Sequence, residues 1–88
     1  MPRVKLFGAF RQYVRAREVE VAARTVGAAL DVLCADNAGL QAALLEGGKL
    51  RSYVRIAVNG RDIELAQGLE TLLAPDDEVA IFSPVAGG

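Results

Sequence analysis

The segment EVAIFS, residues 78–83, decides the fold because aliphatic residues alternate in it with polar or small ones. A period of two is that of a β-strand with one buried face. We therefore expect Val79 and Ile81 to point into a core, and Phe82 to point outward. The segment PVAGG, residues 84–88, follows this strand at once.

Two further alternating runs lie near the other end of the chain. Residues 3–7, RVKLF, predict a strand with Val4 and Leu6 inward, and residues 17–21, REVEV, predict a second one. Runs this close in sequence favour an antiparallel hairpin. Residues 8–16 are expected to form its long, irregular connection.

One amphipathic helix is predicted after this hairpin. Thr25 has the character of an N-cap, and the apolar stripe that follows it at helical spacing consists of Val26, Ala29, Leu30, Leu33 and Cys34. Cys34 on that stripe is expected to be a buried structural thiol. One further helical turn is expected around residues 40–44, before Gly47-Gly48.

The remaining strands lie between the helix and the final segment. Residues 53–58 predict a third strand, and Asn59-Gly60 is a strong signal for a tight hairpin turn. Residues 62–65 are then expected to form a short return strand. Pro75-Asp76-Asp77 predicts the turn before the last strand.

This order of elements indicates an α+β domain. One helix can cover one face of a mixed sheet of about five strands. If the first and last strands are parallel neighbours in the middle, the arrangement is a β-grasp, as in ubiquitin. We expect the β-grasp domain to span residues 1–83, with an extended tail over residues 84–88.

Composition excludes several classes of function. The 88 residues include no histidine and one cysteine, so the commonest general base, the commonest metal ligand and a disulfide framework are absent. The net charge of −1 argues against nucleic-acid binding, and no apolar run approaches the length of a membrane span. We therefore expect a protein located in the cytoplasm, with no histidine-based catalysis of its own, no metal and no bound cofactor.

The charges are segregated along the chain. Residues 1–24 carry six basic side chains, whereas residues 62–88 carry six acidic ones and no lysine or arginine. Complementary patches for partners are one interpretation. We favour neutralisation between strands that lie side by side in one sheet.

In the alternating pattern of their strands, Phe7 and Phe82 fall on solvent-facing positions, and each lies at the C-terminal end of its strand. If those strands are parallel neighbours, both rings lie at the end of the sheet from which the tail leaves, and we predict that they bind a partner. The alternative is that residues 8–16 fold over and cover them.

The terminal glycines suit chemistry at the α-carboxylate of Gly88. A carboxylate that is ionised at neutral pH needs activation, for example by ATP, before a sulfur donor or an amine can attack it. Glycine has no Cβ, so it can pass a narrow channel and leave its carbonyl open to attack. Val85, Ala86 and Gly87 would form the rest of the inserted tail.

Three segments carry a family resemblance. DEVAIFSPVAGG (77–88), with VNGRDI (58–63) and KLFGAFRQYV (5–14), resembles the small ubiquitin-like sulfur carriers of the MoaD/ThiS family, and the MoaD type most closely. The chain departs from the family pattern with Asp76 in place of a glycine and Ser83 in place of the first proline before the tail.

The resemblance implies the partners. An E1-like adenylyltransferase of the MoeB/ThiF type would use ATP to adenylate Gly88, and a sulfur donor would convert it to a thiocarboxylate. The large subunit of molybdopterin synthase, of the MoaE type, would then accept the tail. Gly87 and Gly88 match the family's active tail, and Phe7 and Phe82 match its partner-binding face.

The Gly-Gly end leaves alternatives open. The sulfur could go to cysteine, thiamine or tRNA, and EGGKL (46–50) also occurs in carriers that resemble the cysteine branch. The tail could instead form isopeptide bonds with lysines of target proteins. A plain interaction module with an inert tail is the remaining alternative.

Overall fold

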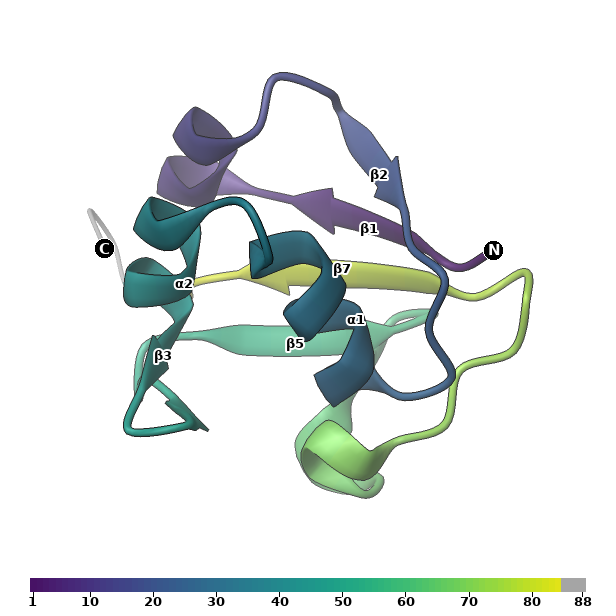
Figure 1. The fold of residues 1–88 in the computed structure, drawn as a ribbon. Coiled ribbons are helices and arrows are strands. Elements are labelled where there is room, and N and C mark those ends of the chain that lie inside the picture. Colours follow the sequence, from purple (N-terminus) through teal and green to yellow (C-terminus); the bar gives the residue numbers. More distant parts are fainter. Residues whose placement is uncertain (85–88) are drawn as a thin grey trace.

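Five strands form one mixed sheet in the computed structural model, which describes residues 1–84 (Figure 1). The strands are β1 (Arg3–Leu6), β2 (Glu18–Glu20), β5 (Arg55–Val58), β6 (Arg61–Asp62) and β7 (Glu78–Phe82). Their order across the sheet is β2-β1-β7-β5-β6. β1 and β7 are parallel neighbours at the centre, and the other pairs are antiparallel. The predicted β-grasp topology is therefore confirmed.

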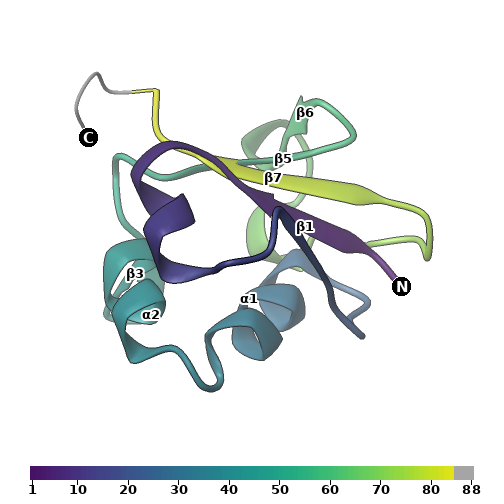
Figure 2. The same cartoon turned by 90° about the horizontal axis from the view of Figure 1, so that it is seen from above.

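Two α-helices cover one face of this sheet, as Figure 2 shows. They are α1 (Val26–Cys34) and α2 (Ala38–Leu44). Thr25 caps α1 as predicted, because its Oγ1 accepts a hydrogen bond from the N–H of Ala28 at 3.1 Å. Asn37 caps α2 in the same way, accepting from the N–H of Leu40 at 3.0 Å. The second helix is longer than the single turn that the sequence indicated.

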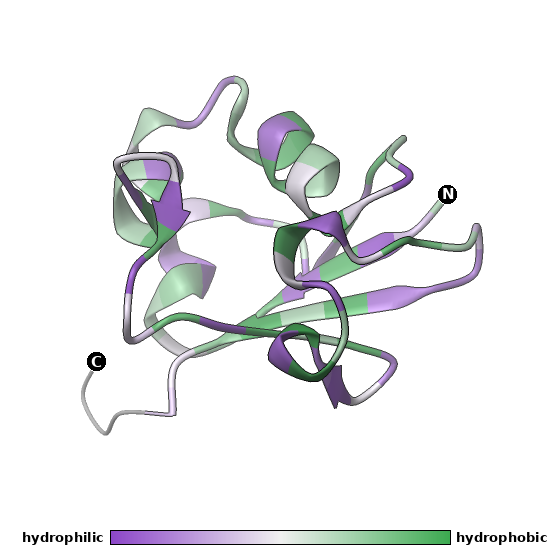
Figure 3. Cartoon of the chain, turned by 90° about the horizontal axis from the view of Figure 1, so that it is seen from below, coloured by the Kyte–Doolittle hydropathy of each residue, from purple (hydrophilic) through white to green (hydrophobic). Residues whose placement is uncertain are grey.

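The register of the central strands puts their aliphatic residues in rows beneath the helices. Leu6 pairs with Ile81 on β7, and Ile81 pairs with Ile56 on β5. All three are buried, with Ile81 at 0% exposure. Hydrophilic and hydrophobic residues alternate along β1 in Figure 3. Along β7 the burial alternates instead, because Val79 and Ile81 are buried and the residues between them are only half-buried, so the sheet has one face for the core and one for solvent.

Much of the rest of the core comes from the helices and from the connection after β1. The buried residues that these elements contribute are Phe10, Val26, Ala29, Leu30, Cys34, Leu40 and Leu44. They belong to the same hydrophobic cluster as the inward residues of the sheet. The chain therefore builds a single core between the sheet and its helical layer.

The charges on the open face of the sheet neutralise one another across strands. Glu78 on β7 lies 3.3 Å from the Nζ of Lys5 and 3.9 Å from a guanidinium nitrogen of Arg3, both on β1. The three side chains are about 40% exposed, so each pair stabilises the fold only slightly. These contacts support the cross-strand interpretation of the charge segregation.

Two connections differ from the expectation. The segment after β1 is a 3₁₀-helix, η1 (Gly8–Tyr13), rather than an irregular loop. The predicted return strand over residues 62–65 is wrong, because β6 is confined to Arg61–Asp62 and the chain then turns into η2 (Ile63–Leu65). Ile63 is buried in the core at that turn, which a straight strand would not permit.

Short elements fill the remaining connections. β3 (Leu45–Glu46) and β4 (Lys49–Leu50) form a separate two-stranded hairpin after α2. Gly47 and Gly48 both have positive φ, 60° and 80°, so they permit the tight turn between β3 and β4. A further 3₁₀-helix, η3 (Gly68–Glu70), lies against α1.

Candidate docking surface

The parallel pair of β1 and β7 brings Phe7 and Phe82 to the same end of the sheet. Leu6 pairs with Ile81, and the backbone N–H of Phe7 donates to the carbonyl of Ile81 at 3.0 Å. Phe7 thus continues the line of β1, with extended dihedrals of −122° and 158°. It occupies the position beside Phe82, as the sequence predicted.

Both aromatic residues belong to the solvent face of the sheet. Phe7 follows Lys5 by two residues and is 46% exposed, and Phe82 follows Ala80 by two residues and is half-buried. The buried neighbours Leu6 and Ile81 point the other way. The predicted parity of these two positions therefore agrees with the structure.

The connection after β1 does not cover these rings from the solvent side. Phe10 in η1 is buried in the core on the helical side of the sheet, at 4% exposure. The side-chain amide of Asn37 donates to the carbonyl of Tyr13 at 2.9 Å, which ties the end of η1 to the start of α2. Tyr13 also lies beside Gly39, where an added Cβ would come within 3.1 Å of the tyrosine ring. η1 is thus anchored to the helical layer.

Arg55 completes this end of the open face, and the sequence alone did not indicate it. It is exposed, it starts β5, and it pairs directly with Phe82 across the antiparallel ladder. Side chains of directly paired residues lie on the same face of a sheet. We call the group Lys5, Phe7, Arg55, Ala80 and Phe82 the tail-end surface.

The tail itself begins at the edge of this surface. Ser83 and Pro84 follow Phe82 directly, and the predicted site residues Val85, Ala86, Gly87 and Gly88 lie outside the described residues. The structure therefore brings Phe7 and Phe82 together next to the point where the tail leaves the sheet. It does not describe the tail residues that would carry the chemistry.

Cys34 is buried, so its thiol is not accessible to act as a nucleophile. Its thiol is buried in α1, and burial, with a smaller contribution from the charge of Asp31, raises its pKa above the ordinary value. The thiol is thus protonated at neutral pH and packs as an apolar group. The expected structural role agrees with this placement.

Two further features are absent from the described range. Residues 1–84 contain no cluster of three potential metal ligands. Within the same range, neither α-helix has the length and hydropathy needed to cross a membrane.

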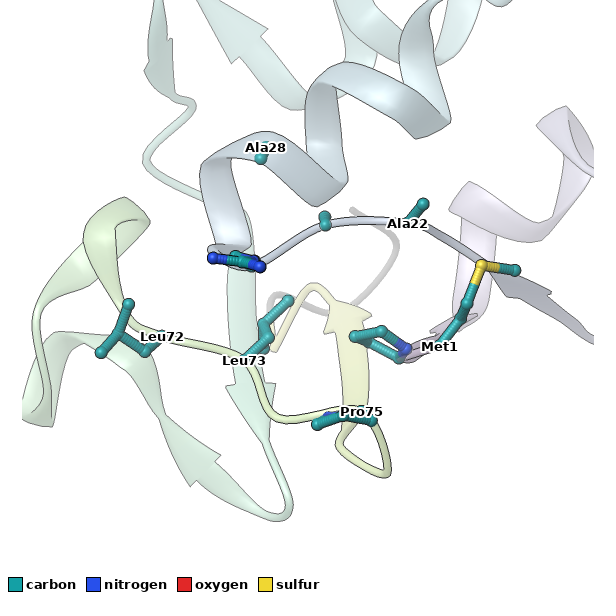
Figure 4. Close-up of a pocket in the computed structure, with 9 residues that line it drawn as sticks. Met1, Ala22, Ala28, Leu72, Leu73 and Pro75 are labelled. Carbon is teal, nitrogen blue, oxygen red and sulfur yellow. The ribbon is translucent and has the colours of Figure 1, made fainter.

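An apolar groove lies at the opposite end of the sheet (Figure 4). It has a volume of about 810 Å³ and is lined by Met1, Pro2, Ala22, Ala23, Arg24, Ala28, Leu72, Leu73 and Pro75. Pro2 and Pro75 precede β1 and β7, whereas Phe7 and Phe82 end them. The groove is therefore separate from the tail-end surface.

This architecture defines a class of protein: a ubiquitin-like β-grasp domain whose last strand leads into a Gly-Gly tail beside an exposed aromatic pair. Comparison with known proteins identifies the family. Residues 4–88 match the ThiS family, and this chain belongs to it. It is a small protein of the ubiquitin-like sulfur-carrier and modifier class, related to carriers rather than to enzymes.

Individual relatives agree with this assignment. The chain is 34% identical over 88 residues to small archaeal modifier protein 3 of Haloferax volcanii, covering 97% of this chain and 96% of the relative. It superposes on small archaeal modifier protein 1 of Methanosarcina acetivorans with a TM-score of 0.89 and 32% identity, over 99% of this chain and 95% of the other.

A bacterial structure is equally similar in shape. The match is to a chain in the crystal structure of the Amycolatopsis orientalis BexX/CysO complex, with a TM-score of 0.89 and 28% identity. All of both chains is covered. The likeness extends from archaeal modifier proteins to a chain of the BexX/CysO complex.

Proposed function

We propose that this chain carries sulfur as a thiocarboxylate on Gly88. The observation that carries the proposal is where the described chain leaves the sheet: Ser83 and Pro84 follow β7 next to Phe7 and Phe82, and the sequence beyond them ends in Gly87-Gly88 within the family match. A partner that binds these two rings holds the domain by its tail end. The last residues are then aimed into that partner.

The first step is activation by an E1-like adenylyltransferase of the MoeB/ThiF type. The Gly88 carboxylate attacks the α-phosphorus of ATP, forming an acyl-adenylate and releasing pyrophosphate. ATP is bound by the enzyme and not by this chain. A carboxylate with a pKa of about 3.5 is ionised at neutral pH and is a poor electrophile, so this step is needed before any acyl transfer.

The second step exchanges oxygen for sulfur. Sulfide (HS⁻) from a donor attacks the Gly88 carbonyl, a C–S bond forms, the C–O bond to the phosphate breaks, AMP leaves, and the proton of the sulfide passes to solvent. The absence of a Cβ at Gly87 and Gly88 leaves both sides of the reacting carbonyl accessible. All the catalytic groups belong to the partners, which fits a chain without histidine and with its one cysteine buried.

For the sulfur acceptor we propose the precursor of molybdopterin, bound to the large subunit of molybdopterin synthase of the MoaE type. The support is the resemblance of the terminal segment to MoaD-type carriers. The tail-end surface offers that subunit the same apolar contact that it offers the activating enzyme. The two partners would then bind in turn.

A second candidate is supported by the names of the relatives. Two of them are called small archaeal modifier proteins, and a third structure is a BexX/CysO complex. In this alternative an amine of a target lysine, or a different sulfur acceptor, attacks the activated Gly88. The first step is the same in every case.

The test is the intact mass of the chain after incubation with the E1-like enzyme, ATP and a sulfide source. We expect a gain that matches the replacement of one oxygen by sulfur, located at Gly88 by fragmentation. Chains lacking Gly88, or carrying Gly88→Ala, serve as controls and should gain nothing while keeping the wild-type melting temperature.

The outcomes separate the candidates. Turnover of the pterin precursor by the thiocarboxylate form together with the MoaE-type subunit supports the molybdenum branch. Adenylation without a stable sulfur gain, but with lysine-linked adducts in cell extracts, supports conjugation. Absence of adenylation by the E1-like enzymes of the source organism contradicts the proposal and favours an inert tail.

A further inference from the structure

We propose that Arg55 forms an ion pair with an acidic side chain of the activating enzyme and thereby determines which enzyme the carrier selects. This inference rests on the proposed function, because it specifies the chemistry of the partner that activates Gly88. It assigns a role to a residue that sequence patterns did not single out. The partner surface it implies is an apolar pocket bordered by carboxylates.

The first argument is position. Arg55 pairs with Phe82 across the β5–β7 ladder, while Phe7 follows the Leu6–Ile81 pair on the other side of β7. The guanidinium group is therefore attached next to the exposed aromatic pair, on the same face of the sheet. A partner that covers the rings of Phe7 and Phe82 also covers Arg55.

The second argument is the lack of an internal partner for this cation. Within residues 1–84, the ion pairs with nitrogen–oxygen distances up to 4.0 Å are those of Glu78 with Arg3 and Lys5, and of Arg51 with Glu46. Arg55 belongs to none of them. Two acids, Asp62 and Glu64, line a hollow that Arg55 also lines, and neither lies within 4.0 Å of its guanidinium nitrogens.

Asp62 is already engaged by the backbone. Its Oδ1 accepts the N–H of Glu64 at 2.8 Å and so caps η2. Glu78, the acid on the neighbouring strand, has Lys5 and Arg3 beside it. The described neighbourhood therefore leaves the Arg55 guanidinium free to meet a carboxylate from outside.

The third argument is the net charge of the tail-end surface. Lys5 lies 3.3 Å from Glu78 and pairs in register with Glu18 on β2, whereas Arg55 forms no ion pair within residues 1–84, so Arg55 is the uncompensated charge of this surface. An apolar centre with a cationic border attracts an apolar pocket with an acidic border and repels a basic one. Arginine is suited to this contact because it pairs with carboxylates in two parallel hydrogen bonds and also packs on aromatic faces.

Such a contact should act on docking rather than on the chemistry. Arg55 lies on the sheet, whereas the reacting carboxylate is at Gly88, six residues after Phe82 by sequence. Loss of the ion pair should raise the KM for the carrier in adenylation and leave kcat unchanged. It should also reduce the salt dependence of binding, since one charge–charge contact is removed.

The experiment compares Arg55→Glu with Arg24→Glu. Both change the net charge by the same amount, but Arg24 is an exposed residue of the groove at the opposite end of the sheet. The probe is the E1-like adenylyltransferase of the source organism, with ATP–pyrophosphate exchange for KM and kcat and calorimetry for affinity at low and high salt. We expect Arg55→Glu to weaken binding roughly tenfold or more at low salt and Arg24→Glu less than about twofold.

The failures can be told apart. If wild type is adenylated but Arg55→Glu and Arg24→Glu behave alike, the inference is overturned and the proposed function stands. If Arg55→Glu lowers kcat or the melting temperature instead of raising KM, the residue is structural and the inference is again overturned. If wild type itself is not adenylated, both fail together.

Discussion

On the inner face of β7, Val79 and Ile81 are almost fully buried, whereas on its outer face Ala80 and Phe82 keep part of their surface exposed. Every second residue of this short strand thus packs in the core, and the residues between them lie on the open face of the sheet. The inner residues are fixed by packing against helices of the same chain. The outer residues do not pack against the helices. Their amino-acid type can therefore be selected for contact with a partner rather than for packing in the core.

The sharpest test of this comparison is truncation on the inner face. Ile81→Ala should lower the free energy of unfolding by about 2–5 kcal/mol, because a fully buried side chain is removed from a core that cannot fully close around the space. Denaturant unfolding followed by circular dichroism measures this. Phe82→Ala, one residue further along, is the matched control and should cost clearly less. The reverse order would mean that the assignment of the two faces is wrong.

The next largest effect is expected on the outer face, in binding rather than in stability. Phe82→Asp should weaken binding to the activating enzyme by about 2 kcal/mol, because an aromatic anchor is replaced by a charge in an apolar contact. The melting temperature should change little.

Leu72→Asp provides the control for this exchange. Leu72 is 73% exposed and lines the groove at the opposite end of the sheet, so the same type of substitution there should leave binding nearly unchanged. If Phe82→Asp unfolds the domain, Phe82 belongs to the core and not to the tail-end surface. If both variants lose the same binding affinity, the tail-end surface is no more important for binding than the groove at the opposite end of the sheet.

The smallest expected effect concerns the turn that sets the register of β7. Asp77 accepts hydrogen bonds from the N–H of Ala74 and from the side-chain amide of Asn59, both at 2.8 Å, and these bonds lower its pKa below 3.8. A carboxyl with a lowered folded pKa stabilises the fold above pH 3.8, and this contribution is lost as the pH falls through the folded value. The group is exposed, so the contribution is small.

Melting temperatures of wild type and Asp77→Asn, recorded from neutral to acidic pH, measure this contribution. The difference between the two proteins should be constant at neutral pH and should shrink below pH 3.8, where the wild-type carboxyl becomes protonated. Parallel curves down to the lowest pH would show that the hydrogen bonds of the turn do not favour the ionised form.

Much of this fold could be predicted because its decisive signals are local. Thr25 caps a helix with its own hydroxyl, and Asn59-Gly60 supplies a residue pair with positive φ, 51° and 85°, for a tight turn. The alternation in residues 3–6 and 78–82 is likewise readable without knowing any neighbour. Even the solvent-facing parity of Phe7 and Phe82 follows from it, once the two strands are taken as parallel.

What could not be predicted depends on distant parts of the chain. Phe10 enters the core because η1 packs on α2, and Ile63 does so because the chain bends sharply after Asp62. Ala57 pairs with Ala80 on the open face of the sheet and is only 8% exposed, since a small side chain in the middle of a sheet is shielded by its neighbours. Arg55 acquires its importance only through pairing with Phe82, a residue 27 positions away by the numbering.

The parallel pairing of β1 with β7 also has a mechanical consequence. A partner that draws on the C-terminus pulls along the axis of β7, while hydrogen bonds to β1 on one side and β5 on the other run across that axis. Such bonds are loaded together in shear, rather than one after another as when a hairpin is unzipped. The domain should thus resist unfolding when a bound partner pulls on its C-terminal end.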